Sequence, residues 1–267
     1  MEWQWDETLF AGTAAHYVVG RMAYPPALAD ALRDALGLDG TGRLLDVGCG
    51  PGSLTMMLAP LFASAVGVDP DPEMIEVARR AAPQIEWRRL RGEELPDGLG
   101  TFRTVVFAQS FHWMDQPLVA DRVRGMLDQD GAWVHVSAMT HRGADDADDD
   151  LPFDRPPWDR IDALVASYLG PVRRAGAGTL PSGTRGGEQD VMRAAGYRGP
   201  QRVAVPRGEV VVRSTDQVVA AVLSLSGSAP HLFGDRLESF VGDLRKVLGT
   251  GPFAERARDV ELVIWRP

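Results

Sequence analysis

The chain has 267 residues, 45% of them hydrophobic and 24% charged, and a formal net charge of −9. This length fits one large domain or a domain with an added cap, and the composition is that of a globular protein with enough apolar residues for a core. The acidic balance, without a long lysine or arginine stripe, excludes a typical nucleic-acid-binding protein, because phosphate contacts need a clustered basic face.

Apolar runs and amphipathic stretches alternate through the first half of the chain. Residues 25–37 predict a helix, in which Leu28, Leu32 and Leu36 recur every four residues and Gly37 marks the end. Strands are predicted after it at residues 43–47, 64–69, 84–90, 104–108 and 131–137. The helices predicted between them are residues 53–62, 71–82, with Asp71 as N-cap, and 115–127.

The alternation stops after residue 138. Residues 141–159 are rich in Asp, Gly and Pro and predict an exposed connection, and we interpret the aspartate run at 145–150 as a solvated loop. Helices are predicted at 214–226, which opens with a Ser-x-x-Gln capping-box pattern, and at 235–249. Residues 260–265 predict a late strand that returns to the sheet.

This order of elements predicts the fold class and a division of the chain. Strands that alternate with helices are typical of an α/β fold with a parallel, doubly wound sheet. We expect a core at residues 40–138, completed by a final strand at 256–267. Residues 1–39 and the helices within 139–255 are expected to cover it as a lid.

Several features of the sequence bear on metal binding, cellular location and partners. The single cysteine, Cys49, excludes an internal disulfide and a cysteine-rich zinc site, and we expect no metal. The first ten residues lack a basic n-region and an apolar h-region, and no run approaches the roughly 18 apolar residues of a membrane span. We therefore expect a cytoplasmic protein, a monomer or homodimer, without nucleic-acid or membrane partners.

The stretch LLDVGCGPG, residues 44–52, ends a strand in Asp46 and places Gly48, Gly50 and Gly52 at alternate positions. A dinucleotide fingerprint needs G-x-G-x-x-G, and a phosphate-binding P-loop needs a Gly-Lys-Ser/Thr ending; neither is present. Asp46 would repel a pyrophosphate but suits a cationic amine or sulfonium. Asp69, 19 residues after Gly50, can accept hydrogen bonds from ribose hydroxyls. An adenosine-containing, cationic, phosphate-free ligand fits these clues, and S-adenosylmethionine is such a ligand.

Four motifs in order carry a resemblance to a known family. LLDVGCGPG followed by VGVDPDPEMIEVAR resembles the first two motifs of class I S-adenosylmethionine-dependent methyltransferases of the small-molecule type. RGEELPDGLGTFRTVVFAQSFHWMD is similar to the adenine-side acidic motif and the motif after the fourth strand, and RGMLDQDGAWVHV to the step into the fifth. The resemblance covers about residues 40–138 and extends to HYVVGRMAYP at 16–25. It implies a Rossmann-like, seven-stranded, mostly parallel sheet with helices on both faces.

The resemblance also implies roles for individual residues. The residues it assigns to S-adenosylmethionine, which leaves as S-adenosylhomocysteine, are Arg21, Asp46, Gly48, Gly50, Asp69, Pro70, Met74, Gly92, Glu93 and Gln109. Arg91 departs from the small or acidic residue that relatives often have there, which leaves the adenine contact on that side open. Cys49 is interpreted as a small loop residue rather than a nucleophile, since no basic residue in the loop would lower its pKa.

The substrate side is expected after the fourth strand, at Phe111, His112 and Trp113. Tyr17 and Tyr24 are candidates to contribute from the N-terminal segment, although ordinary packing against the sheet edge is the favoured alternative for each. His112 is the candidate general base, although packing alone is an equal interpretation and an amine acceptor would need no base. No role is expected for His141 or His231.

The sequence thus predicts an enzyme that methylates O, N or C of a small molecule, such as a natural-product or quinone-type acceptor. The alternatives are a non-catalytic S-adenosylmethionine-binding regulator and a nicotinamide-dependent oxidoreductase.

Overall fold

The computed structural model describes residues 6, 8–144, 150–172, 174, 175, 178, 179, 187–206 and 208–267. The interpretation of the aspartate run as a solvated loop falls, for residues 145–149, outside this part of the chain.

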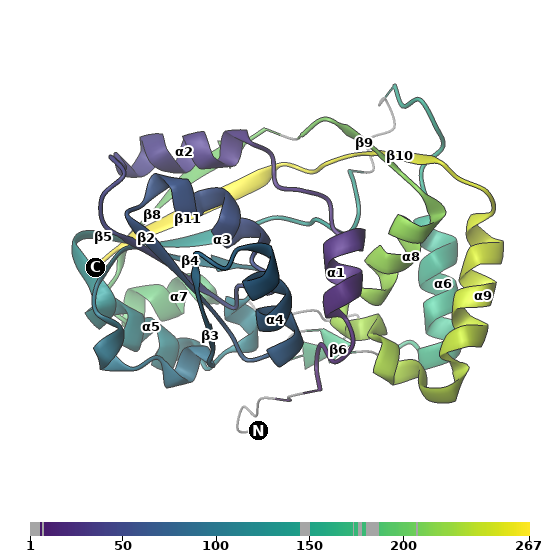
Figure 1. Cartoon of the computed structure of the whole chain (residues 1–267), viewed down its shortest axis with the longest axis horizontal. Coiled ribbons are helices and arrows are strands. Elements are labelled where there is room, and N and C mark those ends of the chain that lie inside the picture. The colour runs from purple at the N-terminus through teal and green to yellow at the C-terminus, as the bar shows by residue number, and fades with distance from the viewer. Residues whose placement is uncertain are drawn as a thin grey trace.

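A seven-stranded sheet forms the centre of the molecule (Figure 1). Its spatial order is β3-β2-β1-β4-β5-β11-β8, and β11 runs in the direction opposite to the other six strands. The strands are β1 (Arg43–Val47), β2 (Ser64–Asp69), β3 (Glu86–Arg89), β4 (Phe102–Ala108), β5 (Leu127–Ser137), β8 (Arg198–Val205) and β11 (Val260–Arg266). The order reverses between β1 and β4, and at such a point an open α/β sheet leaves a crevice at the carboxyl ends of its strands.

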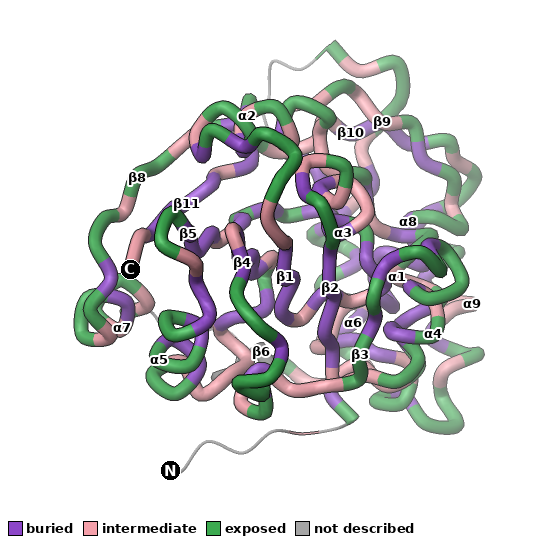
Figure 2. The backbone as a smooth tube through the Cα atoms, turned by 60° about the vertical axis from the view of Figure 1, so that its left-hand side comes forward, coloured by how far each residue is buried: buried purple, intermediate pink, exposed green. Residues whose placement is uncertain are grey.

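Helices cover both faces of the sheet, as predicted. On one face lie α2 (Ala27–Leu36), α3 (Ser53–Leu58) and α4 (Pro72–Ala81), and on the other α5 (Gln116–Met126) and α7 (Glu188–Ala194). Neighbouring strand residues alternate between the two cores: Leu44 packs under the first layer and Leu45 under the second. Figure 2 shows β1, β2 and β4 running largely buried through the middle of the molecule.

Most of the remaining elements lie beside the sheet and its helices in a separate part of the molecule, which we call the helical unit. It contains α1 (Ala14–Gly20), α6 (Trp158–Leu169), α8 (Thr215–Leu223), α9 (Leu237–Leu248), and the antiparallel pair β9 (Val210–Arg213) and β10 (Phe253–Arg256). A Cβ atom on Gly20 would lie 2.2 Å from the backbone nitrogen of Ala221, so glycine is what lets α1 pack directly on α8. A separate two-stranded pair joins β6 (Arg174–Ala175) and β7 (Gly178–Thr179).

The predicted division of the chain needs correction at two places. Within the expected cover segment 1–39, only α1 belongs to the helical unit, because Leu28, Leu32 and Leu36 of α2 are buried against the sheet. Within 139–255, α7 packs on the sheet and β8 is its seventh strand. The sequence analysis did not predict β8, since most of its residues are at least partly exposed on the sheet edge and carry no apolar alternation. No helix in the described part of the chain has the length and apolar character of a membrane span.

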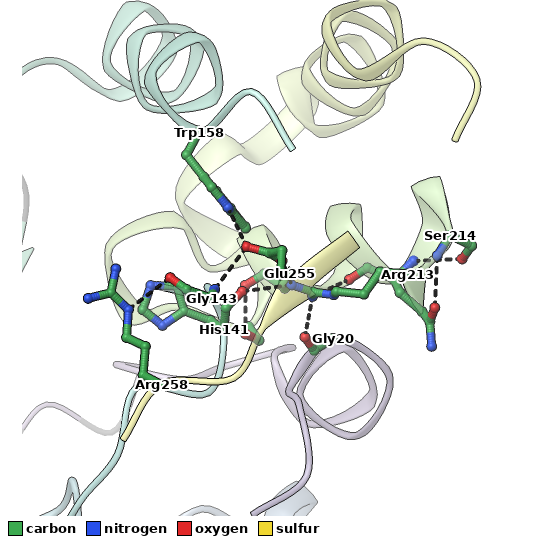
Figure 3. Close-up of polar contacts among 11 residues, drawn as sticks. Gly20, His141, Gly143, Trp158, Arg213, Ser214, Glu255 and Arg258 are labelled. Carbon is green, nitrogen blue, oxygen red and sulfur yellow. Dashed lines mark hydrogen bonds and ion pairs between the residues drawn. The ribbon is translucent and has the colours of Figure 1, made fainter. Parts of the chain in front are cut away.

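A buried ion pair connects the helical unit to the sheet (Figure 3). Arg213 at the end of β9 donates to Glu255 of β10 over 2.6 Å, and each side chain is only 2% exposed. Arg213 also donates to the carbonyls of Gly20 and His141, at 2.6 and 3.0 Å. Glu255 accepts from the backbone N–H of Gly143 and from the indole N–H of Trp158, at 2.8 and 2.7 Å. Four separate segments therefore meet at this pair.

We expect Glu255→Gln to lower the free energy of unfolding by about 3–5 kcal/mol, because the Arg213 guanidinium would stay buried without its countercharge. Urea unfolding followed by circular dichroism measures the change. The matched control is Glu261→Gln, which breaks the Arg202–Glu261 pair of the same 2.6 Å length but with side chains 44% and 41% exposed. The control should cost no more than about 1 kcal/mol, and equal losses in the two variants would contradict the role given to burial.

Candidate functional site

A cavity of about 590 Å³ lies at the carboxyl ends of the parallel strands. Its walls come from the segments that follow β1 to β5, and α1 and the turn at Leu225 and Ser226 close it from the helical unit. A volume of this size is typical of sites that enclose a cofactor or a small molecule. The cavity is therefore the candidate functional site, at the place where strand order reverses.

The glycine loop forms one wall of the cavity. A Cβ atom on Gly48, where φ is +72°, would lie 2.4 Å from the Cβ of Ser110, so only glycine permits this approach of the β1 and β4 loops. Gly50 also has a positive φ, +55°, but a Cβ there would meet nothing within 4 Å. The backbone at Gly50 therefore faces open space inside the cavity, where a ligand can approach it closely.

Asp69 lies beside this loop at the end of β2 and lines the cavity. Its two carboxylate oxygens accept backbone N–H groups, one from Gly50 at 2.8 Å and one from Asp71 at 2.9 Å. Burial raises the pKa of Asp69 to about 6, although the two N–H donors oppose the shift. Asp71 caps α4, as predicted, by accepting from the N–H groups of Glu73 and Met74. Asp69 thus fixes the glycine loop and keeps a face toward the cavity.

The segment after β3 supplies the next part of the wall. Gly92 and Glu93 line the cavity, together with Pro70 and Met74 from the start of α4. Glu93 accepts the backbone N–H of Asp115 at 2.8 Å, which ties this segment to the start of α5. Arg91 also lines the cavity, and its Nε lies 3.6 Å from Glu93. Arg91, which differs from the small or acidic residue expected at this position, therefore lies at the candidate site.

Gln109 follows β4 with φ of +56°, the single positive value at a non-glycine residue in the described chain. Such a backbone is uncommon for a residue with a side chain and is often found at functional sites. Gln109 lines the cavity, and its neighbour Ser110 donates from its hydroxyl to the carbonyl of Val47 at 2.6 Å. The β4 loop is therefore held against the end of β1.

Beyond Gln109 the wall becomes aromatic. His112, Trp113, Tyr17 and Phe10 line this part, and the Trp113 and Phe10 rings meet edge to face with centroids 5.5 Å apart. Burial lowers the pKa of His112 to about 4, so its imidazole is neutral at neutral pH and able to accept a proton. The rings surround this end of the cavity with apolar surface.

Arg21, at the end of α1, lines the cavity as well. Its Nε donates to the Ser224 hydroxyl at 2.9 Å and its Nη2 to the Ser224 carbonyl at 3.2 Å, and the guanidinium lies 4.5 Å from the centre of the Tyr17 ring. Among the residues that the structure describes, no carboxylate forms an ion pair with it. Arg21 therefore offers a positive charge to whatever occupies the cavity.

Three predicted site residues do not line this cavity. Asp46 is fully buried behind the glycine loop, where its Oδ2 accepts a hydrogen bond from the Thr55 hydroxyl of α3 at 2.6 Å. Tyr24 is partly buried and packs against the core on the α2–α4 side of the sheet. Phe111 is 2% exposed in an aromatic cluster with Phe107 and Trp133, and it borders a separate cavity of about 610 Å³.

Other residues reach the cavity that sequence reasoning did not select. His141 lies in the loop after β5 and lines the wall, although no role was expected for it. The rule that ligands bind beyond the carboxyl ends of parallel strands would have pointed to this loop. Leu225 and Ser226 could not be found this way, since they come from the helical unit.

Cys49 is buried, and burial raises the pKa of its thiol, which makes it a poor nucleophile. Within the described residues, no group of three or more His, Cys, Asp or Glu side chains is placed to hold a metal ion.

Part of the chain is similar to known methyltransferases. Residues 44–131 match the model of a methyltransferase domain. An uncharacterised methyltransferase of Mycobacterium tuberculosis is 36% identical over 118 residues, which are 44% of this chain and 47% of that protein. A probable S-adenosylmethionine-dependent methyltransferase of Saccharomyces cerevisiae is 29% identical over 46% of this chain and 45% of its own length. The chain thus matches about half the length of these curated relatives.

Two further similarities are shorter or more distant. The trans-aconitate 2-methyltransferase of an Azoarcus species is 45% identical over 62 residues, 21% of this chain and 24% of that protein. Among solved structures, an S-adenosylmethionine-dependent methyltransferase from Clostridium acetobutylicum superposes with a TM-score of 0.38 and 20% identity, over 46% of this chain and 57% of that one.

The buried carboxyl of Asp46 should make stability depend on pH. Burial raises its pKa from 3.8 to about 7, so between these values the folded state binds a proton that the unfolded chain has lost. The free energy of unfolding of the unmodified protein, minus that of Asp46→Asn, should therefore fall as pH rises from 5 to 7, by at most about 1.4 kcal/mol per pH unit. It should level off above that range.

Urea unfolding at four pH values measures this difference. Asp39→Asn is the control, because the Asp39 carboxylate is exposed and accepts from Thr41, which lowers its pKa. A difference for Asp46→Asn that stays constant or rises with pH would contradict the prediction.

Proposed function

We propose that the chain is a class I S-adenosylmethionine-dependent methyltransferase, since residues 44–131 match a methyltransferase domain, and that it methylates a small molecule held in the covered cavity. The observation that carries this proposal is the open face of Gly50 beside the buried carboxylate of Asp69, inside a cavity of about 590 Å³.

The residues present fit the cofactor that the family implies. Gly50 leaves room for a ligand against the backbone, and Asp69 has acceptor capacity for hydroxyl groups beyond the two N–H groups it already binds. Under the loop, the Oδ1 atom of Asp46 is buried without a hydrogen-bond partner in the structure. Asp46 does not line the cavity, but when ionised its charge behind the glycine loop would favour a cationic ligand over a phosphate.

The chain's own residues would then bind and orient the two reactants. Arg21 would hold the carboxylate of the methionine part, and Pro70, Met74, Gly92 and Glu93 would contact the adenine. The bound cofactor supplies a methyl group on a sulfonium, which is already activated for transfer. Much of the catalysis can then come from proximity and orientation. His112 would orient the acceptor or take its proton, and the aromatic wall at Trp113 and Tyr17 would exclude water.

A small acceptor is supported by the cover over the cavity. The α1 helix and the Leu225–Ser226 turn form its wall on the side of the helical unit, which favours a small acceptor over an extended protein or nucleic-acid surface. The name of the Azoarcus relative gives a small acid as its acceptor, in line with this proposal. Acceptors of natural-product or quinone-type metabolism are included, since their rings suit the aromatic wall.

Cofactor binding can be tested by calorimetric titration with S-adenosylhomocysteine. We expect about one site per chain, and Asp69→Asn should weaken the affinity by about 1–3 kcal/mol, because buried hydroxyl groups would lose a charged acceptor. Asp39→Asn is the matched control, since its carboxylate also accepts a backbone N–H but lies away from the cavity. Absence of binding to folded protein would refute the proposal, and saturable binding of NADH would favour the nicotinamide-dependent alternative.

His112→Asn separates catalysis from cofactor binding. Using an acceptor found by screening phenols, carboxylic acids and amines, we expect turnover to fall at least about tenfold, with the affinity for S-adenosylhomocysteine unchanged within about twofold. Because the pKa of His112 is about 4, its protonation should leave the rate flat between pH 6 and 8. Unchanged turnover would assign His112 to packing, and a screen without any product would favour the non-catalytic regulator.

A further inference from the structure

A second cavity, of about 610 Å³, adjoins the first one on the face of the sheet that α7 covers. Four residues line both cavities: Gln109, Ser110 and His112 from the β4 loop, and Ser137 at the end of β5. His112, the candidate base, therefore lies at the junction of the two. Because they share this wall, a ligand whose reactive atom faces His112 has room for a further part in the second cavity.

The register of β5 and β11 gives the second cavity a direction. Ser137, at the junction, and His135 are two positions apart on β5, and both line the cavity. On β11, Val263 is paired with His135, and Trp265 is two positions further along. At about 3.4 Å per residue, His135 lies about 7 Å and Trp265 about 14 Å from the level of Ser137. The cavity thus extends from the junction along the sheet toward Trp265.

His135 lines this cavity with a ring whose protonation a neighbour fixes. The Trp133 indole N–H donates to the Nε2 atom of His135 at 2.9 Å, so Nε2 is the acceptor of the ring. Burial lowers the pKa of His135 to about 4, and the neutral ring therefore carries its proton on Nδ1. Among the residues that the structure describes, none accepts a hydrogen bond from this Nδ1–H group.

Trp265 supplies a second N–H group. Its side chain lines the cavity and is 1% exposed, and its Nε1 atom is buried without a partner in the described part of the chain. A buried donor without a partner costs free energy comparable to a lost hydrogen bond. His135 and Trp265 lie diagonally on neighbouring strands, about 7–8 Å apart, so one ligand can reach both. An acceptor atom on that ligand would remove the cost.

The charged side chains around the second cavity favour an uncharged acceptor atom. Arg202 pairs with Glu261 at 2.6 Å, and Arg193 with Asp190 at 3.3 Å. Glu188 also lines the cavity, and no described residue forms an ion pair with it. Its carboxylate would repel an anion. The two N–H donors therefore suit a neutral oxygen, such as a carbonyl, better than a carboxylate.

Aromatic rings form the inner wall of the second cavity. Phe107, which is paired with His135 across β4 and β5, lies in the lining together with Phe111, and their ring centroids are 5.4 Å apart. A flat apolar ligand packs well against such a wall. Its acceptor oxygen would then lie about two residues' length from the junction, at the level of His135.

We propose that the second cavity is the distal part of the acceptor site, and that the N–H groups of His135 and Trp265 bind an uncharged carbonyl oxygen of an elongated aromatic acceptor. This inference rests on the proposed function, since the reactive end of the same acceptor faces His112 in the first cavity. It assigns the acceptor to aromatic ketones and related carbonyl compounds.

The test uses two phenols of equal length, 4-hydroxybenzophenone and 4-benzylphenol, which have a carbonyl or a methylene group between their rings. Both, and phenol as the truncated compound, are titrated calorimetrically into protein saturated with S-adenosylhomocysteine. We expect the ketone to bind at least about tenfold more tightly than 4-benzylphenol, because two N–H groups gain an acceptor. We expect 4-benzylphenol to bind at least about threefold more tightly than phenol, because its second ring buries apolar surface.

Two variants locate the carbonyl in the second cavity. Trp265→Phe keeps an aromatic ring but removes the unpartnered N–H group, and His135→Leu removes the other donor. Each should reduce the affinity ratio of ketone to 4-benzylphenol at least about threefold, and leave binding of phenol and S-adenosylhomocysteine unchanged within about twofold. The matched control is Tyr197→Phe, in the same core: Tyr197 is 4% exposed, donates to the Ala120 carbonyl at 3.0 Å and lines neither cavity. It should leave the ratio unchanged.

The outcomes separate this inference from the proposed function. A ketone that binds no better than 4-benzylphenol, a ratio that either variant leaves unchanged, or no binding of the two-ring compounds would overturn the inference. If S-adenosylhomocysteine itself fails to bind the folded, unmodified protein, the proposed function falls instead.

Discussion

The buried pair of Arg213 and Glu255 is the interaction on which the arrangement of the two layers depends. Removing both charges from water costs several kcal/mol each, and the cost is offset only when every polar atom finds a partner. Here the carbonyls of Gly20, His141 and Gln217 and the N–H groups of Gly143 and Trp158 complete the set. The end of α1, the loop after β5, the start of α6 and the pair β9–β10 are therefore fixed to one another. Because α1 and the β5 loop are also cavity walls, the same pair sets the shape of the cavity cover.

The electrostatic character of the cavity follows from where the strands lie. Asp69 ends β2, Asp71 and Glu93 follow β2 and β3, and the arginines that act on His141 lie toward the β5 end. A chain with a formal net charge of −9 thus places four arginines near one end of this cavity, of which Arg213 is paired with Glu255 and Arg142 with Asp162. Its two histidines differ in surroundings: burial alone lowers the pKa of His112, whereas four arginines contribute at His141. The ends of the cavity therefore suit different chemical groups.

The sequence predicted the core because its signals are local. Apolar runs, helical spacing and turn residues specify β1 to β5 and the helices between them, and the N-cap at Asp71 and the capping box at Ser214 are present as predicted. Properties set by tertiary contacts were missed. Asp46 faces Thr55, nine positions along the chain, and Phe111 packs on Phe107 and Trp133, so neither reaches the cavity. His141 reaches it because β5 ends there, and β8 forms an edge whose exposed residues leave no alternating pattern.

The interlocking of the β1 and β4 loops explains why the two halves of the cavity form one site. Gly48 comes so close to Ser110 that no side chain fits between them, and the Ser110 hydroxyl bonds to the Val47 carbonyl. The strained backbone of Gln109 lies just before this contact and His112 just after it. A shift of the glycine loop would therefore move the residues on both sides of Gln109, since they share these contacts. The position of His112 relative to Gly50 is thus set by the pairing of β1 with β4, before any ligand binds.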